Sequence, residues 1–274
     1  MPACNKVAFV NGKGGCGKTT SIFHVAGVLS AKGEKTLIID LDKQRNTTDS
    51  FLMNNTEDSE SLLENTMFDF LKGTAKPDDV IRQALFKSRG NANPKYYNVD
   101  VMPGDLRFEF AQELLQEIDI KESFDNFVQE QGYSWVLVDM PPSSYRLNQI
   151  CFSQIVDFLV IPFSSDLFSL KGYSDLIDTI EKAREINQNL NLVGVYLSRY
   201  TENCAVDKYI RDKMIKMFGQ AFMDVYIPVR VDIREAVMFG RPMSFYQPNS
   251  PSNKAFIRLV NIMEQRITQF RRNQ

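Results

Sequence analysis

Residues 12 to 20 read Gly12-Lys13-Gly14-Gly15-Cys16-Gly17-Lys18-Thr19-Thr20 and form the most informative segment of the chain. A short apolar run at residues 7–10 precedes it, and apolar residues at positions 22, 25, 26 and 29 follow it at helical spacing. A glycine-rich loop between a buried strand and a helix is the context in which phosphate-binding loops occur. We therefore predict a nucleotide-binding α/β protein whose first strand leads into the site.

The residue types of this loop suit a bound nucleotide. Its glycines let the amides of residues 14–17 turn inward and form an anion cradle at a helix N-terminus. Lys18 is expected to reach the β- and γ-phosphates, the Thr19 hydroxyl to bind Mg²⁺, and Thr20 to lie near the α-phosphate. Cys16 fills a position that requires a small residue. ATP and Mg²⁺ are the expected cofactors.

Lys13 is a second lysine in the loop, five positions before Lys18. It could be a solvated side chain of structural use within one subunit. The more specific interpretation is a cation offered to the nucleotide of a neighbouring subunit, as an arginine finger is.

The segment from Lys13 to Thr20 resembles the deviant Walker A motif of the ParA/MinD ATPases, and ParA/Soj-type DNA partition ATPases are the most similar members. In that family the first lysine reaches across a nucleotide-sandwich dimer, so the resemblance implies that Lys13 acts in trans in an ATP-bound homodimer. It also implies a doubly wound, mostly parallel β-sheet flanked by helices. Three further stretches extend the resemblance over nearly the whole chain.

The first stretch, residues 37–46, is an apolar strand that ends in Asp40 and Asp42. Two aspartates at alternate positions project from one face at the carboxyl end of a strand, where open α/β sheets bind ligands. The matching family pattern is Asp-x-Asp-Pro-Gln-x-Asn, which implies Asp40 for hydrated Mg²⁺ and Asp42 for orienting the attacking water. Lys43 stands where the family usually has proline.

The second stretch, residues 135–142, is a run of four apolar residues followed by Asp139. A carboxylate at the tip of a buried parallel strand fits the Walker B position, which holds Mg²⁺ through water. Met140 departs mildly from the family pattern, and Pro141 and Pro142 fix the loop that follows.

The third stretch covers residues 192–199, 226–229 and 234–242 and resembles the C-terminal half of ParA. By that match the base pocket is lined by Ser198, Arg199, Pro228 and Val229.

The chain of 274 residues is 43% hydrophobic, which allows one sizeable core, and we predict a single domain over residues 1–274. Further strands are expected at residues 99–104 and 158–162, and helices at 173–185, 206–218 and 254–267. Residues 53–95 are polar and are expected to form a variable surface region of one or two helices. The apolar face predicted for that region consists of Leu62, Leu63, Met67, Phe70 and Leu71.

Several function classes lack support in the sequence. The first strand starts close to Met1, so no N-terminal helix-turn-helix domain is expected, and neither a signal peptide nor a membrane-spanning run is present, which predicts a cytoplasmic protein. Four cysteines, at positions 4, 16, 151 and 204, show no CxxC or zinc spacing and are expected to be free thiols. His24 is expected to be packed rather than catalytic.

Partition of DNA is the favoured function: ATP-driven dimerisation, nonspecific DNA binding on the nucleoid, and hydrolysis stimulated by a ParB-like or other centromere-binding partner. The net charge of −2 allows only a local basic patch. Its candidates lie in the C-terminal half: Lys208, Arg211, Lys213, Lys216, Arg230, Arg234, Arg241, Arg258, Arg266, Arg271 and Arg272.

Two alternatives remain open at this point. A MinD-like positioning ATPase would bind a membrane through its C-terminal helix, where apolar residues from Phe256 to Phe270 precede Arg271 and Arg272, although core packing explains that stripe more simply. Membrane binding is therefore not expected. A metabolic synthetase or reductase would need a substrate pocket or cluster ligands, and the sequence offers neither.

Overall fold

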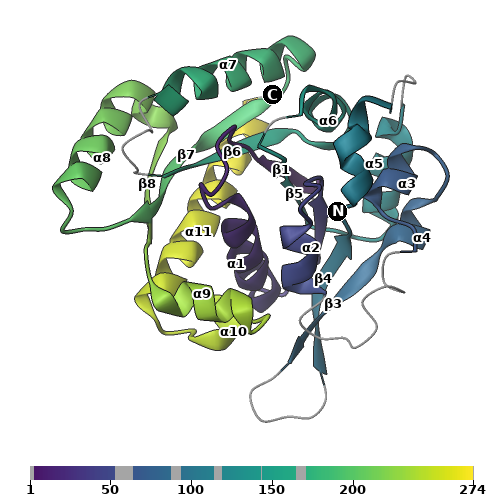
Figure 1. Ribbon diagram of the computed structural model, residues 1–274, viewed down its shortest axis with the longest axis horizontal. Coiled ribbons are helices and arrows are strands. Elements are labelled where there is room, and N and C mark those ends of the chain that lie inside the picture. Colours follow the sequence, from purple (N-terminus) through teal and green to yellow (C-terminus); the bar gives the residue numbers. More distant parts are fainter. Residues whose placement is uncertain are drawn as a thin grey trace.

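A sheet of eight strands forms the centre of the protein (Figure 1). The computed structural model describes residues 3–52, 64–87, 94–113, 119–142, 144–164 and 171–273. The strands are β1 (Asn5–Phe9), β2 (Thr36–Asp40), β3 (Arg82–Lys87), β4 (Pro94–Met102), β5 (Trp135–Asp139), β6 (Phe158–Ser164), β7 (Asn191–Tyr200) and β8 (Phe222–Pro228). Neighbouring strands are parallel except β3 and β4, which are antiparallel. The predicted doubly wound, mostly parallel α/β fold is confirmed.

The strand order, β3-β4-β2-β5-β1-β6-β7-β8, puts β1 inside the sheet between β5 and β6. The chain leaves β1 toward β2 on one side and later returns to β6 on the other side, so the order reverses at β1. Open α/β sheets bind ligands at such a switch point, beyond the carboxyl ends of the strands. The loop at residues 12–20 follows β1 and therefore lies at this position.

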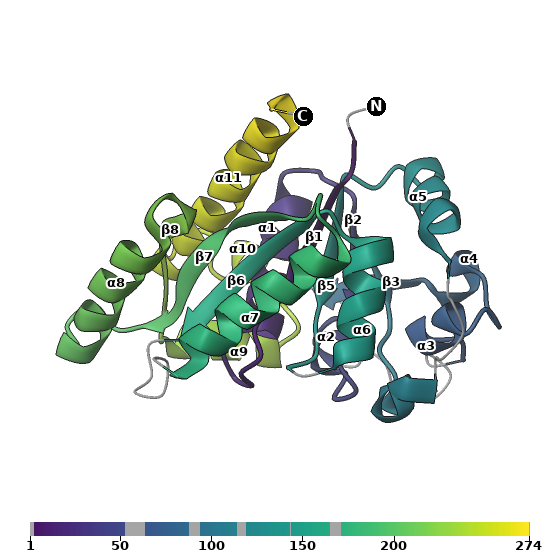
Figure 2. The same ribbon diagram turned by 90° about the horizontal axis from the view of Figure 1, so that it is seen from above.

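Helices cover both faces of the sheet (Figures 1 and 2). One face carries α1 (Lys18–Ala31), α2 (Asn46–Phe51), α9 (Val231–Met238), α10 (Met243–Tyr246) and α11 (Pro251–Arg272). The other face carries α5 (Lys121–Glu130), α6 (Tyr145–Ile150), the π-helical turn η4 (Cys151–Ile155), α7 (Lys171–Ile186) and α8 (Ala205–Phe218). The helices predicted at residues 173–185, 206–218 and 254–267 correspond to α7, α8 and α11.

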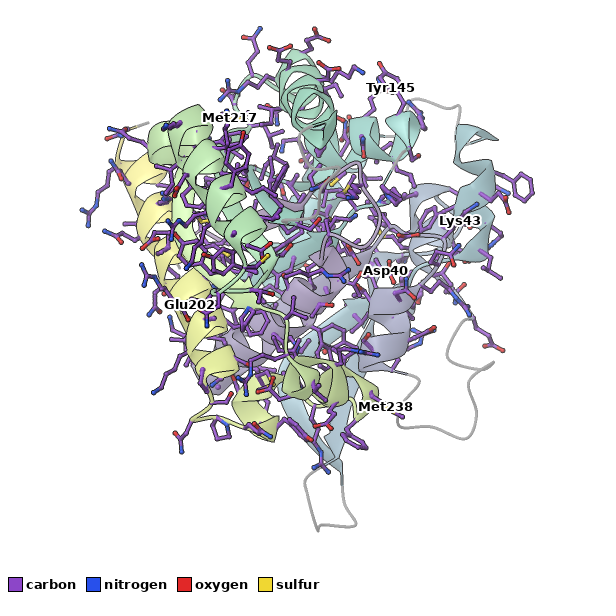
Figure 3. The ribbon with its side chains drawn as sticks, turned by 60° about the vertical axis from the view of Figure 1, so that its left-hand side comes forward. Asp40, Lys43, Tyr145, Glu202, Met217 and Met238 are labelled. Atoms are coloured by element: carbon purple, nitrogen blue, oxygen red, sulfur yellow. The ribbon has the colours of Figure 1, made fainter. Side chains whose placement is uncertain are left out.

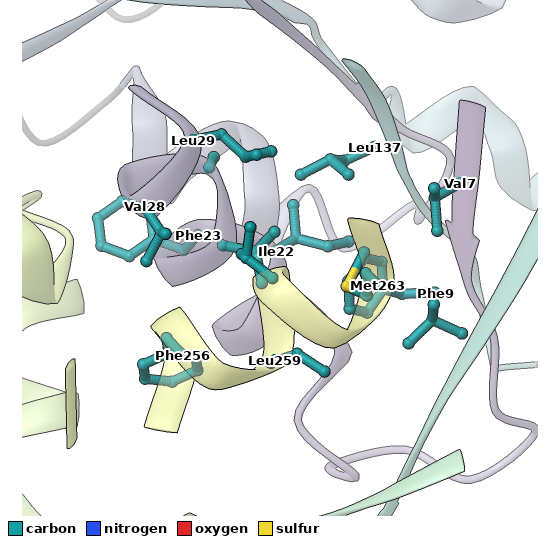
Figure 4. Packing of buried hydrophobic residues seen from close by; sticks show 14 of the residues in the cluster. Val7, Phe9, Ile22, Phe23, Val28, Leu29, Leu137, Phe256, Leu259 and Met263 are labelled. Atoms are coloured by element: carbon teal, nitrogen blue, oxygen red, sulfur yellow. The ribbon is translucent and has the colours of Figure 1, made fainter. Parts of the chain in front are cut away.

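The core beneath α1 and α11 is built from alternate residues of the strands (Figure 4). Val7 and Phe9 of β1 point toward Ile22 of α1 and Met263 of α11, and all four side chains are fully buried. Each large apolar side chain buried in this way contributes roughly 1.5–3 kcal/mol relative to the exposed side chain. Ala8, between Val7 and Phe9, belongs to the second core on the opposite face of the sheet.

The described part of residues 53–95 contains a strand in addition to the one or two surface helices predicted there. The described part contains two short helices, α3 (Met67–Leu71) and α4 (Pro77–Val80), and then β3, which pairs with β4 as an antiparallel edge strand. The strand predicted near residue 99 starts earlier than expected, at Pro94. Met67, Phe70 and Leu71 are buried in the second core, while Leu62 and Leu63 lie outside the described residues.

The apolar stripe of α11 packs into the protein. Phe256, Leu259, Val260, Met263 and Ile267 are all buried against α1 and the sheet. Core packing therefore accounts for these residues. Within the described residues, no helix has the length and hydropathy needed to cross a membrane.

His24 and the cysteines also occupy structural positions. His24 is fully buried in α1, where its ring lies 4.5 Å from that of Phe256 and its Nδ1 accepts a hydrogen bond from the Met243 amide. The four cysteines are free thiols, as predicted, and Cys16 and Cys151 are buried.

Candidate functional site

The phosphate loop is held in shape by its glycines and by Asn11. Gly15 and Gly17 have φ of 74° and 89°, in the left-handed region that favours glycine. The Asn11 side chain donates to the Pro162 carbonyl of β6 and accepts from the Lys13 amide, so it fixes the start of the loop to the neighbouring strand. The loop ends at Gly17, where α1 begins, and the free amides of a helix N-terminus favour an anion.

Lys18 is the first residue of α1 and its side chain is buried. Its ammonium donates to the Asn11 carbonyl at 3.2 Å, so the side chain folds back along the loop toward the end of β1. A lysine in this position brings a positive charge to the cradle without exposing it to solvent. Lys13 is more exposed than Lys18 and lies at the beginning of the loop.

Asp139, at the carboxyl end of β5, receives two hydroxyl groups. Thr19 of α1 and Thr47 of α2 both donate to Oδ2 of Asp139, each at 2.6 Å. The other oxygen, Oδ1, is buried and has no hydrogen-bond partner among the described residues. An unpaired buried carboxylate oxygen is costly, and a hydrated cation would satisfy it.

The donor set beside the loop fits Mg²⁺. Carboxylate and hydroxyl oxygens are the ligands that this cation prefers, and it keeps several waters and phosphate oxygens when bound with a nucleotide. The described ranges contain no group of three or more His, Cys, Asp or Glu side chains that could hold a metal ion. Thr19 and Asp139 therefore suit a metal that arrives with phosphates.

Asp40 lies beside Asp139, because the two residues pair in register at the ends of β2 and β5. It is fully buried; its Oδ1 accepts from the Asp42 amide, and its Oδ2 accepts from the amide and hydroxyl of Thr48. Burial, with the nearby Asp139 charge as the second cause, raises the pKa of Asp40 to about 7. Burial likewise raises the pKa of Asp139. Two adjacent buried carboxylates form a site that favours a bound cation.

Gly104 supports Asp40 from the end of β4. Its amide donates to the Thr48 hydroxyl at 2.9 Å, and that hydroxyl donates to Asp40. A Cβ atom at residue 104 would lie 3.0 Å from both the Asp40 carboxyl carbon and the Asp42 carbonyl. Glycine is therefore needed here for the close approach of the two loops.

Asp42 is partly exposed at the rim of the site, two residues beyond β2. Its carboxylate accepts from the Gln44 amide, which caps the turn before α2. Lys43, which replaces the usual proline, forms an ion pair with Glu109 at 3.2 Å on the short helix η3 (Leu106–Glu113). Figure 3 places Lys43 and Asp40 on the same side of the molecule.

The residues assigned to a base pocket lie at the ends of β7 and β8. The Ser198 hydroxyl donates to the Cys16 carbonyl, and Arg199 Nη1 donates to the Gly15 carbonyl at 3.2 Å. Val229 is 57% exposed, and its amide donates to the Tyr200 carbonyl. Ser198 and Arg199 thus contact the phosphate loop directly, whereas Pro228 and Val229 lie on the adjacent strand end.

Sequence reasoning missed four residues of this site: Asn11, Thr47, Thr48 and Gly104. The two threonines come directly after the segment 37–46 that carries the paired aspartates, so their hydroxyls were an available signal. Asn11 and Gly104 act through contacts with distant strands, and the sequence gives no local sign of them.

Comparison with known proteins agrees with this geometry. A sequence profile described as an AAA domain matches residues 4–192, more than half of the chain. The chromosome partitioning protein ParA of Caulobacter vibrioides is 27% identical over 262 residues, covering 93% of this chain and 91% of the relative. The chromosome-partitioning ATPase Soj of Thermus thermophilus is 27% identical over 265 residues, covering 96% of each chain.

Solved structures share the fold. A putative plasmid partition protein from Borrelia burgdorferi bound to AMPPNP superposes with a TM-score of 0.71 at 21% identity, covering 96% of this chain and 99% of that one. Cobyrinic acid a,c-diamide synthase from Mycobacterium smegmatis, with an ATP analogue and magnesium, superposes with a TM-score of 0.74 at 17% identity. The match covers 94% of this chain and 93% of the synthase. With the profile match and the loop geometry, these findings establish that the chain belongs to the ParA/MinD family of P-loop ATPases.

Proposed function

We propose that this protein is a ParA-type ATPase that partitions DNA. ATP binding drives formation of a sandwich homodimer, the dimer binds duplex DNA without sequence preference, and a ParB-like activator stimulates hydrolysis and release. The observation that carries the proposal is the buried Oδ1 of Asp139, which has no partner among the described residues and lies beside Thr19 and the phosphate loop. The named partition relatives align with this chain almost end to end. The cofactors are ATP and Mg²⁺.

Each residue of the site has a distinct task in this proposal. Lys18 binds the β- and γ-phosphates, and Thr19, Asp139 and Asp40 would hold Mg²⁺ beside them. The ion, when bound, neutralises charge on the phosphates. Asp42, at the rim, orients the attacking water.

Two further parts of the proposal concern the neighbouring subunit and the base. Lys13, at the start of the loop, is less buried than Lys18 and extends to the partner subunit's nucleotide. Pro228 and Val229, at the end of β8, border the base, next to the end of β7 that carries Ser198 and Arg199. Val229, 57% exposed at the end of β8, has apolar surface available for stacking.

Ion pairs and hydrogen bonds within the C-terminal half reduce the list of basic residues that could contact DNA. Arg211, Arg230 and Arg258 form ion pairs with Asp212, Asp232 and Asp224. Arg266 donates to the carbonyls of residues 193, 221 and 222, and Arg271 to those of residues 3 and 4. These five arginines serve the fold or are already neutralised.

Three lysines on α8 are better candidates for DNA contact. Lys208, Lys213 and Lys216 are exposed, and the Lys213 ammonium lies 5.5 Å from the ring centre of Tyr209, which is 54% exposed. Cations beside an exposed aromatic ring suit a polyanion. We therefore propose α8 as the main DNA-binding element and the nucleoid as the location of the ATP-bound protein.

The membrane and metabolic alternatives receive less support. The apolar residues of α11 that would enter a bilayer are buried in the core. The likeness to the synthetase is at 17% identity and concerns the fold alone.

The test is binding to nonspecific duplex DNA with ADP and with ATP, in the presence of Mg²⁺ and over rising salt. We expect binding only with ATP, weakening steeply as salt rises because phosphate contacts release counterions. Lys208, Lys213 and Lys216 replaced together by Gln should bind less DNA and give a shallower salt slope at unchanged ATP affinity. Lys32, Lys72 and Lys76 replaced together by Gln form the matched control.

Other outcomes would redirect the proposal. ATP-dependent binding to anionic liposomes without DNA binding would favour the positioning ATPases of the same family. Binding to neither would refute DNA partition and leave a nucleotide switch that acts on another protein.

A further inference from the structure

The end of β7 holds the phosphate loop by two of its backbone carbonyls. The Ser198 hydroxyl donates to the Cys16 carbonyl, and the Arg199 guanidinium donates to the Gly15 carbonyl. These carbonyls belong to consecutive peptide units, Gly15–Cys16 and Cys16–Gly17. Both units lie in the part of the loop where Gly15 and Gly17 have positive φ.

Peptide geometry converts these two contacts into a direction for the amides. In a trans peptide the N–H and C=O point in opposite directions. Pulling the carbonyls of Gly15 and Cys16 toward β7 therefore turns the amides of Cys16 and Gly17 away from β7. Among the described residues, the Cys16 and Gly17 amides donate to no backbone carbonyl, so they are available to an anion.

The surroundings of the two side chains show that the contact is built into the fold. Ser198 is only 2% exposed, and a Cβ atom at Gly17 would lie 3.4 Å from the Ser198 Cβ. Arg199 has φ of 55°, an uncommon conformation for a residue other than glycine, asparagine or aspartate. That backbone conformation occurs where the side chain bonds the loop, and strained backbone of this kind is often found at functional sites.

We propose that Ser198 and Arg199 are positioning residues that preorganise the phosphate loop, rather than residues that read the base. The inference rests on the proposed function, since it concerns the nucleotide site of that function. It assigns to β7 the task of aiming two loop amides at the phosphates before the nucleotide arrives. A preformed cradle binds more tightly because less ordering is required on binding.

The two roles differ in which ligand loses affinity. A base-reading residue affects ATP and leaves inorganic tripolyphosphate unaffected. A loop-positioning residue affects both ligands by the same factor. The experiment is displacement of a fluorescent ATP analogue by ATP and by tripolyphosphate, each with Mg²⁺, from the full chain.

Ser198→Ala is the decisive variant, because serine is neutral and its loss changes no charge. We expect a loss of about 3- to 10-fold in affinity for both ligands, as for one hydrogen bond. Ser198→Thr keeps the hydroxyl and should restore affinity. In Arg199→Asn the new asparagine tolerates the left-handed backbone. At high salt, where charge attraction is screened, this variant should lose affinity for both ligands by a similar factor.

Tyr196→Phe is the matched control. Tyr196 lies two residues before Ser198 on the same strand, is also buried, and donates its hydroxyl to the Ser21 side chain of α1, not to a loop carbonyl. The Tyr196→Phe variant should bind ATP and tripolyphosphate with the affinities of the parent chain. Thermal melting of each variant without nucleotide reports whether folding is intact.

Three results would overturn the inference. A loss for ATP alone in Ser198→Ala would assign Ser198 to the base. No loss for either ligand would remove the positioning role, and a parent chain that binds ATP but not tripolyphosphate would contradict a preformed cradle. A parent chain that does not bind ATP would instead refute the proposed function.

Discussion

His24 should make the protein lose stability as the pH falls below neutrality. The imidazole is fully buried in α1 and contacts the rings of Phe23 and Phe256, and its Nδ1 accepts a hydrogen bond from the Met243 amide. Burial lowers the pKa of His24 from 6.5 to about 3 in the folded protein; the backbone of Ile233 and the charge of Asp232 offset only part of that effect. A protonated ring would also lose its acceptor at Nδ1.

The sign and size of the effect follow from proton linkage. Between its folded and unfolded pKa values, the ring is protonated in the unfolded chain and neutral in the folded protein, so stability is complete above 6.5 and decreases as the pH falls toward 3. The decrease is about 1.4 kcal/mol per pH unit, so from about pH 7 to about pH 5 the free energy of unfolding should fall by about 2 kcal/mol on account of this residue.

The assay is urea unfolding at both pH values for the parent chain and for His24→Asn. Asparagine keeps an acceptor oxygen near the position of Nδ1 but does not titrate in this range. It should be less stable than the parent at neutral pH because packing against Phe256 is lost, yet its decrease on acidification should be smaller by about 2 kcal/mol. Equal decreases in the two chains would refute the reasoning.

Four other predictions concern the site and its supporting helix. Lys18→Ala should abolish ATP binding in calorimetry, and normal affinity would contradict the phosphate-loop assignment. Asp42→Ala should bind ATP and dimerise but not release phosphate, so turnover at the parental rate would remove Asp42 from its role. Lys13→Gln should fail to form the ATP-dependent dimer in size-exclusion chromatography, and a variant that dimerises and hydrolyses normally would rule out action in trans. Gly27→Ala should destabilise the fold by about 1–3 kcal/mol in urea unfolding, since the added Cβ would lie 2.1 Å from the Pro242 ring; unchanged stability would show that the ring moves away at little cost.

The central strands were predictable because parallel strands buried on both faces are continuous apolar runs. The runs at residues 7–10, 37–41 and 135–139 each appear as a strand that ends at the site. The phosphate loop was predictable for a related reason: its chemistry depends on backbone conformation, and the glycines that permit that conformation are visible in the sequence.

β3 could not be read in the same way. Residues 82–87 read Arg-Gln-Ala-Leu-Phe-Lys, and most of these residues favour a helix in isolation. The segment is a strand because it pairs with β4, and such tertiary pairing overrides local preference.

The supporting contacts of the site were equally hidden. Asn11 is held by Pro162, and Cys16 by Ser198, each more than 100 residues away along the chain. Such pairs depend on the strand order, which the local pattern does not specify.

Arg271 donates to the carbonyls of Ala3 and Cys4 and so brings the two ends of the described chain together, beyond the strand ends that lie away from the phosphate loop (Figure 2). The two ends of the described chain therefore lie close together, and proteins whose ends are neighbours tolerate circular permutation. Joining the ends with a short linker and opening the chain at the Gly132 turn would leave every strand neighbour unchanged. Such a permuted chain would separate the order in which the elements are synthesised from the order in which they pack.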